Sequence, residues 1–383
     1  SREGIAPAIE SAFNKLDQPM ALGYSSAGTI IELGEDMPDF KVGDRVACAG
    51  GGYAVHAEFN VVPKNLITLL PDSVNFESAA FATLGAIALH GFRLAFPQLG
   101  ENVCVIGLGL LGLLSIQIAR SAGCSVFGVD LSQERVQLAK DMGFPAALTK
   151  DCLDLVPGLT SNHGFDHVLI CADTSSDDPV TLAGQIARDR GNVIAIGSVG
   201  LKIPRKLYYD KELNFKVSRS YGPGRYAPKY EEGGIDYPPG FVRWTEGRNL
   251  QSFIELLATN KVDARSLITH RFPIEDAPLA YELIAGHRRE PFLGVLLTYP
   301  QAVTETSITR KVENLAIKVT GVQKIKLGVL GAGNYAQAVF LPIIKATPGA
   351  DLVGIVTASG LSSHQAAKKF GFKFASTEEE EIL

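Results

Sequence analysis

The stretch from Val103 to Asp130 constrains the fold of this 383-residue chain more than any other part of the sequence. Its first residues are apolar and predict a buried parallel strand, which a glycine-rich turn and a mostly apolar helix follow. The turn reads G-x-G-x-x-G, with Gly107 allowing the tight turn, Gly109 letting the backbone approach a pyrophosphate and Gly112 letting helix and strand pack closely. Because a helix N-terminus presents free N–H groups to phosphates, the stretch predicts a dinucleotide site.

A second apolar run, Ser125–Val129, ends at Asp130, which stands about 20 residues after the glycines, as the motif requires. At the end of a strand this carboxylate can accept hydrogen bonds from both ribose hydroxyls and repel a 2′-phosphate, so we expect NAD(H) rather than NADP(H). The alternative is a glycine-rich turn that binds nothing. The residues that we expect to contact the cofactor are Gly107, Gly109, Leu110, Leu111, Gly112, Asp130, Arg135, Cys171 and Gly197.

Composition excludes several other classes of protein. The net charge of −5 argues against a nucleic-acid partner, and apolar stretches broken by glycine and charge argue against a membrane span. The five cysteines show no C-x-x-C spacing, which argues against a zinc ribbon and for a reducing compartment. We therefore expect a cytoplasmic protein of two or three domains, a homo-oligomer with a small-molecule substrate and with neither nucleic-acid nor membrane partners.

The segment before the fingerprint is β-rich and carries four short motifs in a fixed order. They are GYSSAG at 23–28, VGDRV at 42–46, GYAVHAEF at 52–59 and FATLGAIAL at 81–89. With the fingerprint, these motifs closely resemble the medium-chain dehydrogenase/reductase family from Met20 to about Tyr299. The resemblance implies an α/β protein, with a GroES-like β-rich domain at 1–88 and 246–300 and a doubly wound parallel Rossmann sheet at 89–245. We also expect a helix over 1–20 and a strand pair over 52–63.

The chain departs from the zinc-binding members of that family. Tyr24 stands where they have a zinc-binding His, Ala79 falls on a second ligand position, and their lobe of four cysteines is absent. Cys48 with His56 could at most be a two-ligand remnant, so we expect no metal. The resemblance places Thr83 beside the nicotinamide, although it could equally be an ordinary helix residue.

Without zinc, a side chain must move the substrate proton. Our first choice is Tyr24, with a pKa lowered by a nearby cation, and His56 and Tyr221 are second and third. The alternative is that Tyr24 only fills the space of the lost metal.

The segment 219–244 is rich in arginine, tyrosine, glycine and proline and predicts a long functional loop. Arginine recognises carboxylates and phosphates through two parallel hydrogen bonds, and tyrosine offers a stacking face and a hydroxyl for sugars. We therefore expect Arg219, Arg225 and Tyr226 to bind an anionic, sugar-like substrate. The alternative is a surface loop or a contact between subunits.

After a polar linker at 301–322, residues 323–383 predict the start of a second Rossmann domain. Gly331 and Gly333 form a second dinucleotide turn, and no acid ends the following strand, so NAD or NADP could bind. This part resembles the opening of the glucose–fructose oxidoreductase/inositol dehydrogenase family, and the whole resembles two-domain oxidoreductases of bacterial sugar and polysaccharide gene neighbourhoods.

Together these features predict a zinc-independent, NAD(P)-dependent oxidoreductase that transfers hydride to or from a polar, anionic sugar-like alcohol or ketone. The first rival is a non-catalytic NAD-binding module that serves the C-terminal domain. The second is a quinone or enone reductase, which would need an apolar pocket instead of the arginine and tyrosine loop.

Overall fold

The structure is a computed structural model that describes residues 20–35, 37–300, 311–313 and 325–382. The expected helix over 1–20 and nearly all of the expected linker lie outside the described residues. Two compact units are present, one spanning Ala21–Tyr299 and one containing the described residues after Tyr299, and each is considered by itself. No helix among the described residues is long and apolar enough to cross a bilayer.

The first unit is built on a six-stranded parallel sheet of order β6-β5-β4-β7-β8-β9. This order confirms the expected doubly wound Rossmann topology, because the chain starts in the middle and moves outwards in both directions. Its strands are β4 (Asn102–Ile106), β5 (Ser125–Asp130), β6 (Ala146–Leu148), β7 (Phe165–Ile170), β8 (Ala187–Ala195) and β9 (Asn214–Val217).

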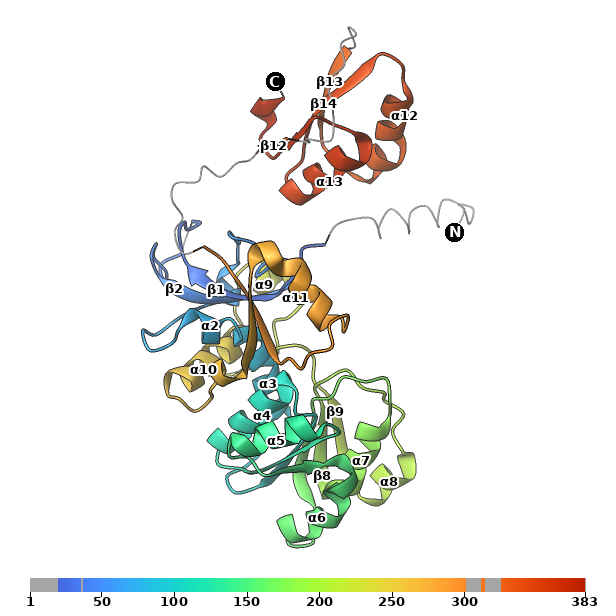
Figure 1. Cartoon of the computed structure of the whole chain (residues 1–383). Helices are drawn as coiled ribbons and strands as arrows, with labels where there is room; N and C mark the ends of the chain where they lie inside the picture. Colours follow the sequence, from blue (N-terminus) through green and yellow to red (C-terminus); the bar gives the residue numbers. More distant parts are fainter. Residues whose placement is uncertain (1–19, 36, 301–310, 314–324, 383) are drawn as a thin grey trace. The chain divides into compact units, whose positions relative to one another are not determined.

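Helices cover both faces of this sheet (Figure 1). One face carries α3, α4 and α5 over a core that includes Leu113 and Ile116, and the other carries α6, α7 and α8 over a core that includes Val168 and Ile186. Central strands read as apolar runs because they are buried on both sides. The helices are α3 (Ala82–Leu94), α4 (Leu110–Ser121), α5 (Gln133–Asp141), α6 (Cys152–Leu159), α7 (Asp178–Ile186) and α8 (Arg205–Asp210).

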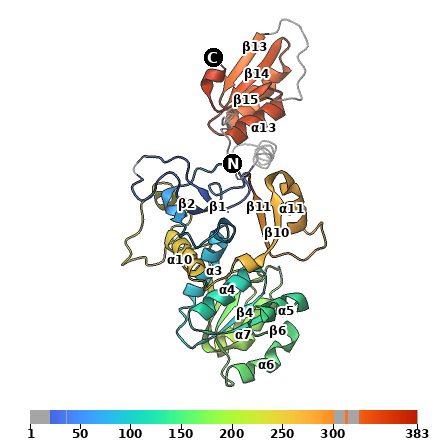
Figure 2. The same ribbon diagram turned by 60° about the vertical axis from the view of Figure 1, so that its left-hand side comes forward.

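The β-rich part of the first unit contains two small sheets, both seen in Figure 2. One is antiparallel, with β1 (Ser25–Thr29), β2 (Arg45–Ala49) and β3 (Ile67–Leu69), and the other pairs β10 (Ile268–Pro273) with β11 (Gly294–Thr298). Four helices accompany them: α2 (Phe76–Ala79), α9 (Pro228–Glu231), α10 (Glu246–Ala258) and α11 (Ala277–Ile284).

The expected strand pair over 52–63 is wrong, because this segment consists of turns and bends. Its backbone bonds locally instead of to a neighbouring strand: the Val55 N–H donates to Asn60 Oδ1 at 3.1 Å, and the Ala54 N–H donates to the Gly50 carbonyl at 2.9 Å. Asparagine side chains that bond nearby backbone compete with a strand ladder in this way.

The second unit holds a four-stranded sheet of order β12-β15-β14-β13. Its strands are β12 (Lys311–Glu313), β13 (Ile325–Leu330), β14 (Ala350–Val356) and β15 (Phe374–Ser376), and its helices are the π-helical turn η5 (Ala336–Phe340), α12 (Leu341–Ala346) and α13 (Gly360–Phe370). β13, β14 and β15 are parallel, as expected for a Rossmann opening. β12 is antiparallel to β15, so the expected linker contains a strand that the sequence analysis missed.

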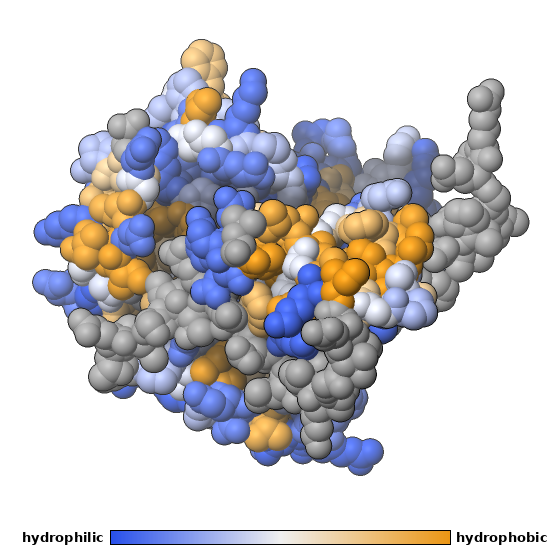
Figure 3. Space-filling view, turned by 90° about the horizontal axis from the view of Figure 1, so that it is seen from above, coloured by the Kyte–Doolittle hydropathy of each residue, from blue (hydrophilic) through white to orange (hydrophobic). Residues whose placement is uncertain are grey.

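Short 3₁₀ turns complete the fold, at Lys64–Leu66, Thr149–Asp151, Arg265–Leu267, Ile274–Asp276 and Glu379–Glu381. Exposed apolar side chains occur in groups with hydrophilic residues between them on the face seen in Figure 3.

A buried polar group lies where the loop 219–244 meets the start of α10. Glu246, the first residue of α10, is fully buried, and both of its carboxylate oxygens lack a hydrogen-bond partner among the described residues. Burial, and then repulsion from Glu231, raise the pKa of Glu246 to about 8, although Arg225 opposes the shift. The carboxyl group therefore holds a proton in the folded chain at a pH where it would lose it in the unfolded chain.

This predicts a pH-dependent stability that Glu246→Gln should remove. Because the pKa is higher in the folded state, the contribution of Glu246 to stability is fully present below about 4.5 and is lost as pH rises through about 8. Relative to the wild type, the Gln variant should gain roughly 2–4 kcal/mol between pH 5 and pH 8, measured by urea unfolding. An equal stability difference at both pH values would contradict the burial of an ionisable carboxyl group.

Candidate active site

The fingerprint turn joins β4 to α4 as the sequence predicts. Gly107 ends the strand with φ +95°, a left-handed conformation that favours glycine. A Cβ on Gly112 would lie 1.8 Å from the carbonyl oxygen of Gly107, so only glycine lets the helix approach the turn this closely. Gly109 caps α4, and Leu110 and Leu111 are its first residues, whose N–H groups have no carbonyl of the preceding turn to bond. These features fit the pyrophosphate of a dinucleotide.

Asp130 has a structural task that the sequence analysis missed. It is 8% exposed, and its two oxygens accept hydrogen bonds from the Leu108 N–H at 2.7 Å and the Ser132 N–H at 2.8 Å. Arg135 lies beside it, with Nη1 at 3.9 Å from Asp130 Oδ2. The same Arg135 atom would be 3.5 Å from a Cβ on Gly109, so a positive charge stands next to the turn. The contact of Asp130 with a ribose stays a prediction.

Cys171 and Gly197 follow the carboxyl ends of β7 and β8, at the edge where the fingerprint also lies. Burial raises the pKa of the Cys171 thiol to about 12, although the Ser115 hydroxyl, 3.5 Å from Sγ, lowers it in part. The thiol is therefore protonated and packs as a small apolar group. A Cβ on Gly197 would lie 2.1 Å from the Ala172 carbonyl oxygen, so this glycine lets the two strand ends approach each other.

Tyr24 and Thr83 lie together at the start of β1. The Thr83 hydroxyl donates to the Tyr24 carbonyl at 3.0 Å, and the Thr83 N–H donates to the Ser25 hydroxyl at 3.2 Å. Thr83 is fully buried, so its hydroxyl fixes this turn. The Tyr24 side chain is 46% exposed, and burial of the rest raises its pKa. The expected lowering of that pKa by a cation is therefore wrong.

His56 is held from two sides. Its Nδ1 lies 3.0 Å from the Tyr281 hydroxyl of α11, and one face of its ring packs on Gly23, where a Cβ would be 2.3 Å from Cδ2, 2.6 Å from Nε2 and 2.9 Å from Cγ. Burial lowers the pKa of His56 below its usual 6.5, so the imidazole is neutral at pH 7. The sequence analysis missed Tyr281, because 225 residues separate it from His56 and no motif marks it.

The loop 219–244 uses one of its arginines for its own structure. Arg225 pairs with Glu231 at 2.5 Å between Nη1 and Oε1, and the other oxygen of Glu231 accepts from the Tyr226 N–H at 3.1 Å. The ring of Tyr226 lies between the guanidinium groups of Arg219 at 4.5 Å and Arg225 at 4.0 Å. Arg225 thus pairs with an acid of its own loop, and its expected contact with a substrate stays a prediction. Arg219 is exposed, and no carboxylate of the described residues pairs with it.

Tyr221 is a poor candidate for direct contact with a substrate. It is 3% exposed, its hydroxyl has no hydrogen-bond partner among the described residues, and its carbonyl accepts from Asn249 Nδ2 at 2.8 Å. Burial, and then repulsion from Glu246, raise its pKa. The residue packs in the core between the loop and α10, which the sequence could not reveal because tyrosine serves in cores and in sites alike.

The donor atoms around Tyr24 do not fit zinc. That Tyr24 and Ala79 replace two zinc ligands of the family stays a prediction; Ala79 is a fully buried apolar residue of α2, and Tyr24 offers only a phenol. Across the part of the chain that the structure describes, no three His, Cys, Asp or Glu side chains gather closely enough to hold a metal ion. Zinc needs three or four such ligands, so no step of the reaction is derived through it here.

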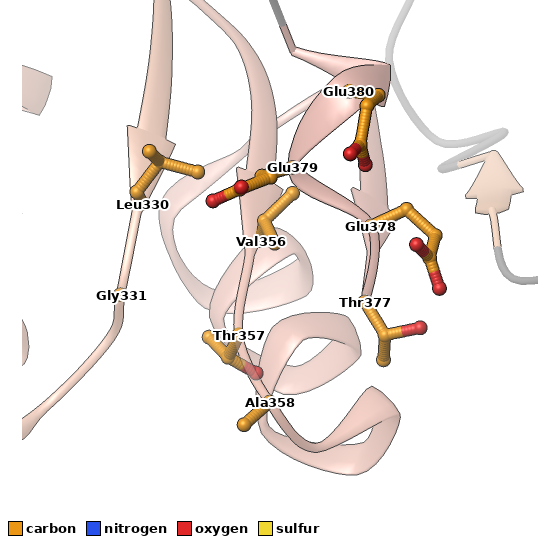
Figure 4. Close-up of a pocket in the computed structure, with 9 residues that line it drawn as sticks. All are labelled: Leu330, Gly331, Val356, Thr357, Ala358, Thr377, Glu378, Glu379 and Glu380. Carbon is orange, nitrogen blue, oxygen red and sulfur yellow. The ribbon is translucent and has the colours of Figure 1, made fainter.

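A cavity of about 450 Å³ opens in the second unit at the carboxyl ends of its parallel strands (Figure 4). It is bounded by Gly331 after β13, by Thr357 after β14 and by three successive acids after β15, Glu378, Glu379 and Glu380. Glu379 extends toward Leu330 and Val356 in Figure 4. The acids were not foreseen, because they follow the third strand and not the second. Cofactor binding by Gly331 and Gly333 stays a prediction.

Comparisons with known proteins agree with this architecture. Residues 6–72 match the family described as alcohol dehydrogenase GroES-like domain, and residues 111–232 match the family described as zinc-binding dehydrogenase. These two matches support the expected similarity to zinc-type alcohol dehydrogenase-like proteins of the medium-chain dehydrogenase/reductase family. As predicted, this dehydrogenase is an NAD(P)-dependent oxidoreductase of CH–OH groups.

Its relatives include several polyol dehydrogenases. The chain is 27% identical to sorbitol dehydrogenase of Bacillus subtilis over 313 residues, covering 72% of this chain and 80% of the relative. It is 26% identical to sorbitol dehydrogenase 1 of Saccharomyces cerevisiae over 310 residues, covering 72% and 81%. Among solved structures, galactitol-1-phosphate dehydrogenase from Escherichia coli is 25% identical with a TM-score of 0.60, covering 73% of this chain and 84% of that one.

Substitutions of Gly112 and Gly109 should have different effects, the first on the stability of the fold and the second on NAD⁺ binding. Gly112→Ala places a methyl group on the Gly107 carbonyl and should cost at least about 2 kcal/mol of unfolding free energy. Gly109→Ala meets only the flexible end of Arg135, so urea unfolding should change little while the dissociation constant for NAD⁺ rises roughly tenfold or more, because the methyl group keeps a pyrophosphate away. Unchanged NAD⁺ affinity in the Gly109 variant would show that the cofactor does not approach this turn.

Proposed function

We propose that this dehydrogenase oxidises a polyol that carries an anionic group, such as a sugar-alcohol phosphate or a sugar acid, without zinc. Relatives named for sorbitol, D-xylulose and galactitol 1-phosphate support the polyol part. The observation that carries the anionic part is Arg219, an exposed guanidinium without an acidic partner among the described residues, stacked on Tyr226. A stacked arginine is well prepared to bind a phosphate or carboxylate through two hydrogen bonds.

We assign the proton transfer to His56 in preference to Tyr24. A base for alcohol oxidation must be unprotonated at working pH, and burial keeps the His56 imidazole neutral. The same effect on Tyr24 raises the pKa of a phenol that is already a weak acid, so it disfavours the phenolate. The nicotinamide of the bound cofactor would accept the hydride from the alcohol carbon. The turn 107–112 with Asp130 and Arg135 would hold the cofactor. We propose NAD(H) as the preferred cofactor because Asp130 ends β5, where a carboxylate would disfavour a 2′-phosphate, while the nearby Arg135 would reduce its repulsion of NADP(H).

Arg219→Gln should weaken the binding of an anionic substrate more than the binding of a neutral one. We expect the KM for galactitol 1-phosphate to rise roughly tenfold or more, while the KM for neutral sorbitol changes less than twofold, because a charge-assisted hydrogen bond contributes about 1.5–3 kcal/mol. Arg225→Gln is the matched control: it breaks an internal ion pair, so it should lower stability and leave the preference between the two substrates unchanged. An equal rise in KM for both substrates in the Arg219 variant would contradict the proposal that the substrate carries an anionic group bound by Arg219.

His56→Gln and Tyr24→Phe separate the two proton-transfer candidates. Loss of a general base lowers turnover by roughly 10²–10⁴, so we expect this loss in the His56 variant and near-normal turnover in the Tyr24 variant. The wild-type rate should fall as pH drops through a value below 6.5, where His56 becomes charged, and this limb should be absent from the His56 variant. The reverse pattern would assign proton transfer to Tyr24.

A further inference from the structure

We propose that Tyr281 is the positioning residue for His56, fixing the ring so that Nδ1 carries its proton and Nε2 is free to accept one from the substrate hydroxyl. This inference rests on the proposed role of His56 and adds a residue from α11 that touches neither substrate nor cofactor. Its basis is the contact between His56 and Tyr281. This contact joins a turn early in the first unit to α11, which lies late in the same unit.

The His56 ring has little freedom to turn. Tyr281 Oη lies 3.0 Å from Nδ1, and the two rings are tilted by 52° with centroids 6.0 Å apart. Gly23, at φ +93°, lies under one face of the ring in space that any Cβ would fill, so the in-plane lone-pair direction of Nε2 is not covered by this glycine. The backbone of His56 is also held, since its N–H donates to the Leu22 carbonyl at 2.7 Å. A glycine under one face and a hydroxyl at Nδ1 thus favour one ring orientation.

The proposed role of His56 requires one tautomer. A neutral imidazole has one N–H and one free lone pair, and a hydrogen bond to one nitrogen decides which of them faces the substrate. With Nδ1–H donating to Tyr281 Oη, the lone pair lies on Nε2, which has no hydrogen-bond partner among the described residues. When the substrate C–H bond gives its hydride to NAD(P)⁺, the O–H proton passes to Nε2, and the carbinol becomes a carbonyl.

The proton acquired by His56 leaves easily. The imidazolium keeps its Nδ1–H bond to Tyr281, which stabilises the charge, and the exposed ring then returns the Nε2 proton to solvent. Burial and then Glu58 raise the pKa of Tyr299, which follows β11 and lies close enough to Tyr281 for that phenol to raise it too. Burial alone lowers the pKa of His56, and no charged side chain contributes to that shift.

The direct test is ¹⁵N NMR of histidine-labelled full-length chain, in which His56→Gln assigns the His56 signals among seven histidines. We expect protonated Nδ1 and unprotonated Nε2 in the wild type. Tyr281→Phe should give a mixture of tautomers and a lower pKa for His56, because the imidazolium loses an acceptor. Tyr299→Phe is the matched control: it removes a nearby phenol hydroxyl that does not bond His56, and it should leave both unchanged. A wild-type ring protonated on Nε2, or an unchanged signal in Tyr281→Phe, would overturn the proposal.

Kinetics of D-sorbitol and galactitol 1-phosphate oxidation with NAD⁺ then separate this inference from the proposed function. Tyr281→Phe should lower kcat roughly tenfold with unchanged KM for NAD⁺, and should add no further loss to His56→Gln, because Tyr281 acts through His56. An equal loss in both backgrounds would make Tyr281 merely structural and overturn the inference. Normal turnover of His56→Gln would refute the proton-transfer role itself, while the NMR result would still decide whether Tyr281 sets the tautomer.

Discussion

The Asp130 carboxylate is the interaction on which the nucleotide half of this dehydrogenase depends. It joins the end of β5 to the turn after β4 by accepting from Leu108, and it starts α5 by accepting from Ser132. Both bonds are charge-assisted and one is fully buried, so removing the carboxylate would leave two backbone N–H groups without partners. The close approach of Gly112 to the Gly107 carbonyl is possible only while this turn keeps its shape.

The polar side chains of the site divide into those used by the fold and those left for chemistry. Thr83 fixes the turn at Tyr24, and Arg225 fixes its own loop through Glu231. Two polar groups, Nε2 of His56 and the guanidinium of Arg219, have no hydrogen-bond or ion-pair partner among the described residues. Nε2 can accept a substrate proton, and the guanidinium can bind a substrate anion. The proposed chemistry therefore uses the polar groups that make no structural hydrogen bond or ion pair.

Sequence reasoning predicted the elements that rest on local pattern. Apolar runs and spaced glycines define the β4–α4–β5 unit, because strand burial and close backbone approach need particular residues at fixed distances. The segment 52–63 failed because side-chain bonds such as Val55 to Asn60 compete with a strand and leave no periodic signal. The burial of Tyr221 and the contact of Tyr281 with His56 depend on long-range packing, which residue type alone does not encode. The Arg225–Glu231 pair is local, but it depends on the loop's conformation, which has no periodic signal. The raised pKa of Tyr24 likewise follows from its surroundings.

The central proposal is that side chains, not a metal, handle the substrate oxygen in this chain, although residues 111–232 match a family described as zinc-binding dehydrogenase. The most direct measurement is the turnover of galactitol 1-phosphate and sorbitol by the full-length chain after exhaustive chelation, with the zinc content of the same sample determined by elemental analysis. The account predicts that turnover persists with far less than one zinc per chain and does not rise when zinc is added. One zinc per chain, with turnover that is lost on chelation and restored by zinc, would contradict it.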